Sequence, residues 1–193
     1  MSMFDRVLTV TNRKLCQGDF LTQIERIAAA HPAGLVLREK DLDENTYRVL
    51  AGDVLRICDA YRVPCMLHRF DAVARALGCP RIHLPLPYLL EHPQAAQGFE
   101  TVGVSVHSVD EAKEAVRLGA TYLTAGHVFL TDCKKGVPAR GLDFLCAVCD
   151  AVPVPVYAIG GITPQNAPDC LAAGASGVAV MSGVMNRLSD WNI

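Results

Sequence analysis

Short apolar runs rich in β-branched residues alternate with amphipathic stretches along the whole chain. Several runs are continuously apolar, as Val178–Met181 is, which is typical of a strand covered on both faces. The pattern therefore predicts eight buried strands. They are expected at Arg6–Thr11, Gly34–Arg38, Pro64–His68, Arg81–Leu84, Thr101–Val106, Tyr122–Val128, Pro155–Gly160 and Gly177–Ser182.

The amphipathic stretches between these runs are predicted to be helices. Thr163 followed by Pro164 favours a helix start, and Gly119 and Gly174 stand where a glycine commonly ends one. In the fourth unit, Pro85-Leu86-Pro87 interrupts the pattern. The predicted helices are Leu21–Ala30, Tyr47–Ala60, Val109–Leu118, Leu142–Ala151, Pro164–Ala173, a poorly formed Leu89–Gln97 and a short Val184–Trp191.

Eight strand–helix units in 193 residues predict a single minimal α/β domain, a (β/α)₈ TIM barrel that spans residues 1–193. A doubly wound open sheet is the alternative. That fold usually has fewer strands and carries a glycine-rich fingerprint after the first strand, which this sequence lacks.

Composition narrows the class of protein further. The chain is 51% hydrophobic and 20% charged, with a formal net charge of −2, as expected for one globular domain. It has no basic cluster and no apolar run of the roughly 20 residues that a membrane span needs, so we expect neither nucleic-acid nor membrane binding. The N-terminus lacks a secretory signal pattern, which favours a cytoplasmic location.

Eight cysteines are many for this length, and in the cytoplasm they are expected to be reduced. Cys146 and Cys149 form a C-x-x-C inside a predicted helix, with no second pair. Because zinc needs four ligands, core packing is favoured over a metal site.

A barrel carries its chemistry at the carboxyl ends of the strands, and two glycine turns lie there. Gly160-Gly161 follow the seventh strand, and Ser182-Gly183 follow the eighth. These two loops often hold a phosphate in barrels, since glycine lets the backbone approach oxygen atoms closely. The alternative is that both are tight turns that need positive φ angles.

His127 follows Gly126 at the end of the sixth strand, where a histidine can move a proton near neutral pH. The polar loop after it, which contains Lys134, could close over an anionic substrate. The alternatives are a hydrogen-bonded core histidine and a solvated surface loop.

Arg38 and Lys40 share one face at the end of the second strand, where both could bind a carboxylate or phosphate. The alternative is an ion pair with Glu39 or with a neighbouring acidic residue. Ser105 and His107 also share a face, although His107 could instead orient the following helix start.

The remaining histidines and the acidic residues suggest no further site. We expect structural or surface positions for His31, His83 and His92. Because no acidic pair stands at a strand end and no histidines have metal-ligand spacing, we expect neither a metal nor a cofactor.

Several segments resemble, in the same order, those of the thiamine phosphate synthases and the related TenI proteins. The most specific stretch is Gly126–Gly136, which looks like the TenI loop, with Gly-His where a synthase has Gly-Pro. The resemblance covers nearly the whole chain and includes Leu37–Lys40, Ser105–Ser108, Gly126–Phe129, Ala158–Ile162 and Gly177–Ser182.

The sequence departs from the synthase pattern where that pattern binds magnesium. The synthases have Gln two residues before the Arg of the second strand, Asn-Asp after the third strand and Gly-Gln-Asp after the fourth. This chain has Val36, His68-Arg69 and Pro85-Leu86-Pro87 at those places. An arginine in place of an aspartate would repel Mg²⁺.

The resemblance to TenI proteins implies a thiazole tautomerase, a metal-independent isomerase of thiamine biosynthesis. Its substrate would be 2-carboxy-4-methylthiazol-5(2H)-ylidene ethyl phosphate, and its product the aromatic carboxythiazole phosphate. His127 would transfer the proton and Arg38 would be available for the carboxylate. The glycine turns would hold the phosphate, and the resemblance also implies a homodimer.

Three alternatives stay open. They are a Mg²⁺-dependent thiamine phosphate synthase, a non-catalytic or regulatory TenI-like barrel, and an enzyme acting on another phosphorylated heterocycle.

Overall fold

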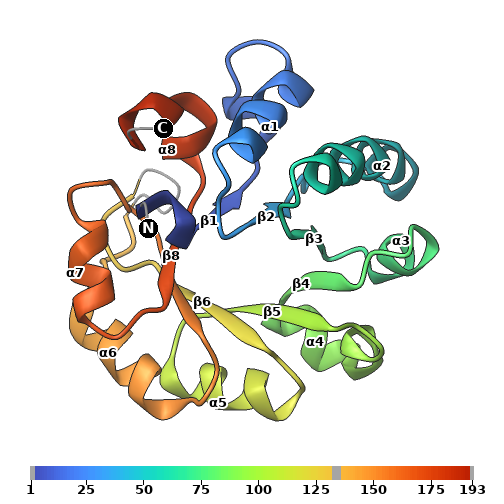
Figure 1. Cartoon of the computed structure of the whole chain (residues 1–193). Coiled ribbons are helices and arrows are strands. Elements are labelled where there is room, and N and C mark those ends of the chain that lie inside the picture. Colours follow the sequence, from blue (N-terminus) through green and yellow to red (C-terminus); the bar gives the residue numbers. More distant parts are fainter. Residues whose placement is uncertain (1–2, 132–135, 192–193) are drawn as a thin grey trace.

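Eight parallel strands close into a barrel, and helices surround it (Figure 1). The computed structural model describes residues 3–131 and 136–191. Each strand pairs with its neighbours in chain order, and β8 pairs with β1 to complete the ring. The strands are β1 Val7–Val10, β2 Gly34–Leu37, β3 Cys65–His68, β4 Arg81–Pro85, β5 Thr101–Val106, β6 Tyr122–Gly126, β7 Val156–Ile159 and β8 Gly177–Val180.

This topology confirms the predicted (β/α)₈ barrel and the eight strands. The edges differ by one or two residues at most strands, and β6 ends at Gly126 rather than Val128. The helices are α1 Phe20–Ala29, α2 Glu44–Ala60, α3 Asp71–Ala76, α4 Leu86–Glu91, α5 Val109–Arg117, α6 Gly141–Ala151, α7 Ala167–Ala172 and α8 Ser182–Asn186. Short 3₁₀ helices occur at Met3–Arg6, Arg13–Leu15, Pro93–Ala96 and Leu188–Trp191.

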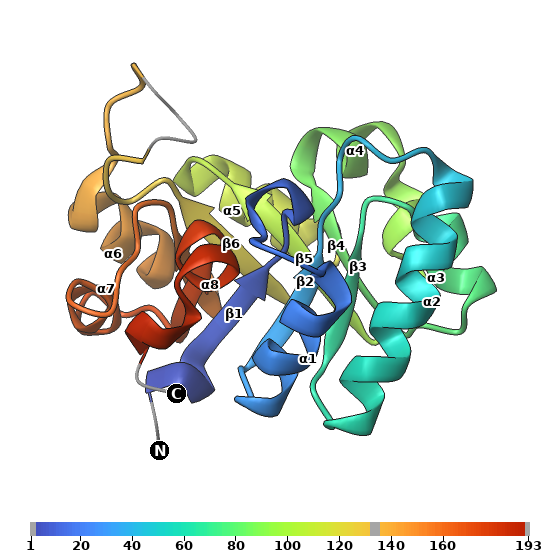
Figure 2. The ribbon, with the colours of Figure 1, turned by 90° about the horizontal axis from the view of Figure 1, so that it is seen from above.

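Alternation along each strand divides the apolar side chains into two layers. One set, including Val36, Met66 and Ala179, fills the interior of the barrel. The larger set, including Leu35, Leu67 and Val178, packs between the strands and the helices. Figure 2 shows α1 and α2 lying side by side outside the strands. Burial on both faces explains the continuously apolar runs in the sequence.

The glycines predicted to end two helices do so. Gly119 and Gly174 have φ angles of +97° and +96°, in the left-handed region. After α5, the Ala120 N–H donates to the Ala115 carbonyl and the Gly119 N–H donates to the Val116 carbonyl. This pair of bonds is a Schellman motif, and it satisfies carbonyls that the helix end would otherwise leave unpaired.

The fourth unit corrects a prediction about proline. Pro85-Leu86-Pro87 does not interrupt the unit, because α4 begins at Leu86 with a proline in its first turn. A proline is tolerated there, since the first turn has no intrahelical use for its missing N–H. The predicted helix at Leu89–Gln97 is replaced by the end of α4 and the 3₁₀ turn Pro93–Ala96.

Two further helix predictions need correction, and one helix is absent from the predicted set. Thr163 caps a turn as predicted, since the Asn166 N–H donates to Thr163 Oγ1 and the Ala167 N–H donates to the Thr163 carbonyl. The helix α7 itself begins only at Ala167, three residues later than predicted. The predicted helix Val184–Trp191 is divided into α8 and a 3₁₀ turn. The helix α3, which is only six residues long, is not among the predicted helices. Among the described residues, no helix is long and apolar enough to cross a membrane.

Candidate active site

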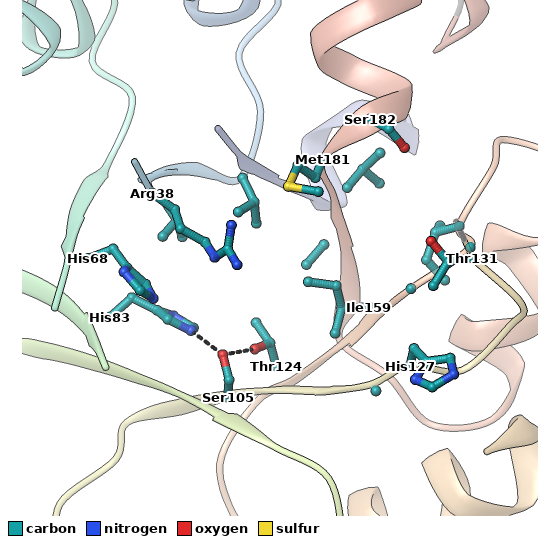
Figure 3. A pocket seen from close by; sticks show the side chains of 18 of the residues that line it. Arg38, His68, His83, Ser105, Thr124, His127, Thr131, Ile159, Met181 and Ser182 are labelled. Carbon is teal, nitrogen blue, oxygen red and sulfur yellow. Dashed lines mark hydrogen bonds between the residues drawn. The ribbon is translucent and has the colours of Figure 1, made fainter. Parts of the chain in front are cut away.

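A cavity of about 330 Å³ opens at the carboxyl ends of the strands, where the barrel rule places the chemistry (Figure 3). Residues at or near the carboxyl ends of all eight strands line this cavity. Most of the residues predicted as binding or catalytic line it, namely Arg38, Lys40, Ser105, His127, Gly160, Gly161 and Ser182.

One predicted residue that the structure describes, Gly183, is not part of this cavity lining. Gly183 lies within α8, where an added Cβ would come 3.2 Å from Val180 Cγ1. A larger residue at this position would therefore press on the Val180 side chain. Lys134 lies outside the described residues.

Arg38 extends from the end of β2 into the cavity (Figure 3). The neighbouring Glu39 is buried, and its carboxylate accepts hydrogen bonds from Thr11 Oγ1 at 2.7 Å and from the Arg13 N–H at 3.0 Å. The Arg38 N–H donates in turn to Thr11 Oγ1 at 2.9 Å. Glu39 and Thr11 therefore connect the ends of β1 and β2.

Two buried histidines form the side of the cavity at β3 and β4. The His68 and His83 rings stack with their centroids 5.9 Å apart and an interplanar angle of 18°. Burial, followed by the positive charge of Arg38, lowers the pKa of His83 to about 3. Burial, followed by His83 and Arg38, also holds the pKa of His68 well below its usual range. Both rings are thus neutral at pH 7.

His83 corrects the expectation that it is merely structural or on the surface. It lines the cavity, with Nδ1 2.8 Å from Tyr122 Oη and Nε2 2.8 Å from Ser105 Oγ. Ser105 Oγ also lies 3.0 Å from Thr124 Oγ1. The alternation of side chains could have indicated this position, because His83 precedes Pro85 by two residues and so faces the same way.

His107 combines the two roles considered for it. Its N–H donates to Glu111 Oε2 at 2.6 Å, while Ser108 Oγ accepts from the Glu111 N–H, so this segment does orient the start of α5. Its side chain also lines the cavity, with Nδ1 2.7 Å from the Gly126 carbonyl oxygen. Since a carbonyl only accepts, Nδ1 carries the hydrogen, and Nε2 of the neutral ring is unprotonated.

His127 follows β6 directly and is 6% exposed. Its Nε2 lies 3.2 Å from the Val137 carbonyl oxygen. By the same reasoning Nε2 carries the hydrogen, so Nδ1 of the neutral ring has a free electron pair. His127 is therefore a buried, hydrogen-bonded histidine that also lines the cavity, with one nitrogen able to accept a proton.

The glycine turn after β7 allows the backbone of the following loop to pack closely. Gly160 has a φ of +102°, and a Cβ there would lie 2.3 Å from His127 Cβ. At Gly161, with a φ of +67°, a Cβ would lie 2.4 Å from the Leu130 carbonyl oxygen. The Phe129 N–H donates to the Gly160 carbonyl at 3.0 Å. Gly160 thus allows His127 to pack closely on the turn after β7, and Gly161 allows Leu130 to do so. Phosphate binding at these glycines stays a prediction.

The side chains at the mouth do not suit Mg²⁺, which the synthase resemblance implies. Magnesium is usually held by one or two carboxylates together with substrate phosphates. Among the described residues that line the cavity there is no aspartate or glutamate, and the charged side chains are Arg38 and Lys40. Within residues 3–131 and 136–191, no three His, Cys, Asp or Glu side chains cluster as a metal site would require.

The cysteines described by the structure are free thiols. Cys146 and Cys149 lie on α6, as expected, with Cys146 exposed and Cys149 partly buried.

Comparison with known proteins places this barrel in a family. The sequence matches the family model described as thiamine monophosphate synthase (TMP-TENI) over residues 7–184. It is 34% identical over 185 residues to thiamine-phosphate synthase 2 of Streptococcus pneumoniae, covering 93% of this chain and 87% of that protein. It is 30% identical to the thiamine-phosphate synthase of Clostridium acetobutylicum, covering 94% of this chain and 87% of that protein.

A solved structure agrees with these relatives. The thiamine phosphate pyrophosphorylase from Pyrococcus furiosus superposes with a TM-score of 0.81 at 25% identity, over 99% of this chain and 92% of that one. The relatives named here carry synthase names, and none of those names specifies TenI. The family match over residues 7–184, together with these identities, shows that the chain belongs to the thiamine monophosphate synthase/TenI family of thiamine biosynthesis.

Proposed function

We propose that this protein is a thiazole tautomerase, a metal-independent isomerase acting on 2-carboxy-4-methylthiazol-5(2H)-ylidene ethyl phosphate. The observation that carries the proposal is the make-up of the cavity. It combines cationic side chains with His127, whose Nδ1 can accept a proton, and has no carboxylate among its described lining residues. Such a site suits proton transfer on an anionic substrate better than magnesium-assisted coupling.

In this proposal the substrate spans the cavity. Its phosphate lies at the Gly160-Gly161 turn and Ser182, and its carboxylate lies toward Arg38 and Lys40, with Ser105 contacting the ring. Ser182 lies on the side of the cavity away from His83 (Figure 3), and Gly160 is also one of the lining residues. Lys134 is proposed as a further contact to the substrate.

The reaction moves one proton off carbon and returns one to another carbon. His127 Nδ1 takes the proton from ring C2, and the C2–H electron pair becomes the C2=N3 bond. The two existing double bonds shift to C4=C5 and onto the exocyclic carbon, which then takes a proton from the imidazolium. The Val137 carbonyl at Nε2 would stabilise this imidazolium, since its oxygen accepts from Nε2–H.

The other histidines are weaker candidates for this role. His83 has both ring nitrogens hydrogen-bonded, and burial makes it a very weak base with a pKa of about 3. His107 keeps an unprotonated Nε2 and is therefore the alternative base that the experiment must separate from His127.

The test is aromatisation of the thiazole tautomer, followed by its ultraviolet absorbance. His127→Asn should slow turnover by about 10²-fold or more, the usual scale for loss of an acid/base group. Binding of the product, the carboxythiazole phosphate, should be retained. His31→Asn is the matched control. His31 is exposed with a φ of +51°, which asparagine tolerates, so this variant should match the parent. A His127→Asn enzyme as fast as the parent would overturn the assignment and favour His107.

A thiamine phosphate synthase is the second candidate, favoured by the names of the relatives. Purified protein would be given the pyrimidine diphosphate, the thiazole phosphate and Mg²⁺. Robust formation of thiamine phosphate would replace the tautomerase proposal. Absence of both activities would instead favour a non-catalytic barrel.

We also propose a homodimer. Sedimentation equilibrium of the purified protein measures its mass in solution, and a monomer would contradict this.

A further inference from the structure

We propose that a buried pair, Tyr122 and His83, fixes the direction of hydrogen bonding on the side of the cavity formed by β4, β5 and β6. As a result the hydroxyls of Ser105 and Thr124 together present one O–H donor to a bound ligand. The ligand that this donor would recognise rests on the proposed function; the direction of the hydrogen bonds does not.

The four side chains form one chain of contacts across three neighbouring strands, β4, β5 and β6. Tyr122 Oη is 2.8 Å from His83 Nδ1, and His83 Nε2 is 2.8 Å from Ser105 Oγ. Thr124 Oγ1 is 3.0 Å from Ser105 Oγ. The last two contacts are drawn as dashed lines in Figure 3. Tyr122, His83 and Thr124 are buried, so a lost partner in this chain has no ready substitute in bulk water.

The tyrosine sets the direction. A neutral imidazole has one N–H and one unprotonated nitrogen, and the low pKa of His83 keeps the ring neutral. The Tyr122 hydroxyl has one hydrogen, and leaving it without an acceptor in a buried position is costly. Within the described residues its hydrogen-bond partner is His83 Nδ1. Tyr122 therefore donates to Nδ1, and the ring hydrogen stands on Nε2, which donates to Ser105 Oγ.

Counting the remaining hydrogens leaves one for a ligand. Ser105 and Thr124 carry two hydroxyl hydrogens, and one of these lies between them, whichever residue donates it. The other cannot go to His83, because Nε2 is already a donor. Neither hydroxyl has a further partner among the described residues, and both line the cavity. The second hydrogen is thus available to a ligand or to water.

Gly103 explains how the tyrosine can reach the histidine. His83, Gly103 and Tyr122 lie opposite one another in register on adjacent strands. A Cβ on Gly103 would lie 2.2 Å from Tyr122 Cζ and 2.4 Å from His83 Nδ1. Only a glycine at this level of the barrel leaves room for the hydrogen bond to pass across the middle strand.

A donor of fixed direction selects for acceptors. It favours an unprotonated ring nitrogen or a carboxylate oxygen, and it disfavours an N–H at the same place, because a site built for one hydrogen-bond direction leaves the other unpaired. The carboxythiazole phosphate of the proposed reaction offers both kinds of acceptor. We infer that Tyr122 and His83 are positioning residues that act through Ser105 on ligand choice.

The first test reads the hydrogen position directly. Two-bond ¹H–¹⁵N correlation spectra of the labelled parent protein, with His83 assigned through His83→Gln, distinguish the protonated from the unprotonated ring nitrogen. We expect Nε2 protonated and Nδ1 unprotonated in the parent, and a mixture in Tyr122→Phe. A parent protein with the hydrogen on Nδ1 would overturn the inference while leaving the His127 experiment unaffected.

The second test measures binding of the carboxythiazole phosphate by calorimetry. Tyr122→Phe lets Nε2 accept the Ser105 hydrogen, so Kd should rise about threefold to tenfold, the scale of one hydrogen bond. Thr124→Val should stay within about twofold, since Ser105 can still donate outward; Ser105→Ala with Thr124→Val should raise Kd by about tenfold or more.

Two controls keep this test specific. Tyr157→Phe changes a neighbouring tyrosine ring, 5.8 Å from that of Tyr122, whose hydroxyl takes no part in the chain of contacts, and should bind as the parent does. Inorganic phosphate should bind equally to the parent and to Tyr122→Phe. If Tyr122→Phe binds the carboxythiazole phosphate as tightly as Tyr157→Phe does, the inference is wrong. If the hydrogen position is as expected but the parent neither binds nor converts the thiazole, the proposed function fails alone.

Discussion

The two sides of the barrel mouth are built in different ways. On the side of β4 to β6, the cavity surface is made of polar side chains whose hydrogens must be in particular places, as at His83, Ser105 and Thr124. On the side of β7 and β8, apart from Ser182, it is made of apolar side chains and of glycine backbone packed against the loop that carries His127. The hydrogen bonds of the first side therefore depend on where the hydrogens stand, whereas the packing of the second side depends on side-chain volume.

The largest effect is expected from adding volume to the second side. In Gly160→Ala the new Cβ would meet His127 Cβ at 2.3 Å and His127 Cα at 2.7 Å, so the loop backbone must move. We expect the free energy of unfolding to fall by about 3 kcal/mol, in the range of strongly destabilising core changes, and turnover to fall with it. Urea unfolding followed by circular dichroism measures the first effect.

Gly119→Ala is the matched control for this change. Gly119 has nearly the same φ, +97° against +102°, but a Cβ there would meet nothing within 4 Å. The free energy of unfolding of Gly119→Ala should therefore fall only by the cost of placing alanine in the left-handed conformation, about 1 kcal/mol. Equal losses in the two variants would mean that backbone strain, not the contact with His127, explains Gly160.

Much of this arrangement follows from local sequence patterns. The eight apolar runs identify the strands because a strand buried on both faces has a continuous apolar sequence. The strand-end rule then identifies His127, Arg38 and the Gly160-Gly161 turn as residues of the mouth, and the structure places all of them in the cavity lining. The family resemblance, read from the same segments, is confirmed for the family and not for its tautomerase branch.

Other features depend on partners that lie far away in the sequence. Alternation from Pro85 could have placed His83 at the mouth, but its hydrogen bonds depend on Tyr122, 39 residues later in the chain, and on Ser105. Nothing in the local sequence distinguishes Gly103 from any other glycine in a strand. Its importance comes from the strand register, which places it between the rings of His83 and Tyr122. The exclusion of Gly183 from the cavity likewise depends on how α8 packs against β8.

Acid should destabilise the protein through the two buried histidines on the polar side of the mouth. The pKa of His83 is about 3 in the folded protein and about 6.5 when unfolded, so below pH 6.5 the unfolded chain binds more protons. The free energy of unfolding should therefore fall as pH decreases from about 6.5 toward 3, by up to about 1.4 kcal/mol per pH unit for this ring. His68, whose pKa is also lowered, adds to the loss in the same direction.

Urea unfolding at a series of pH values between about 7.5 and 5 measures this slope. His83→Gln removes one of the titrating rings and should flatten the slope, whereas His31→Asn on the surface should leave it unchanged. A parent protein whose stability does not change across this range would show that His83 is not buried as a neutral ring.

The smallest expected effects come from two buried threonines that receive the same substitution. Thr124 Oγ1 has a partner in Ser105, whereas Thr9 Oγ1, on β1, is buried without a hydrogen-bond partner among the described residues. Replacing the hydroxyl by a methyl group removes a hydrogen bond in the first case and an unpaired buried polar atom in the second. Thr124→Val should lower the free energy of unfolding by about 1 kcal/mol, and Thr9→Val should raise it by about 1 kcal/mol. Thermal unfolding of both variants under one condition measures the two changes in stability. A change of the same sign in both would contradict the idea that satisfied hydrogen bonds distinguish the polar side of the mouth.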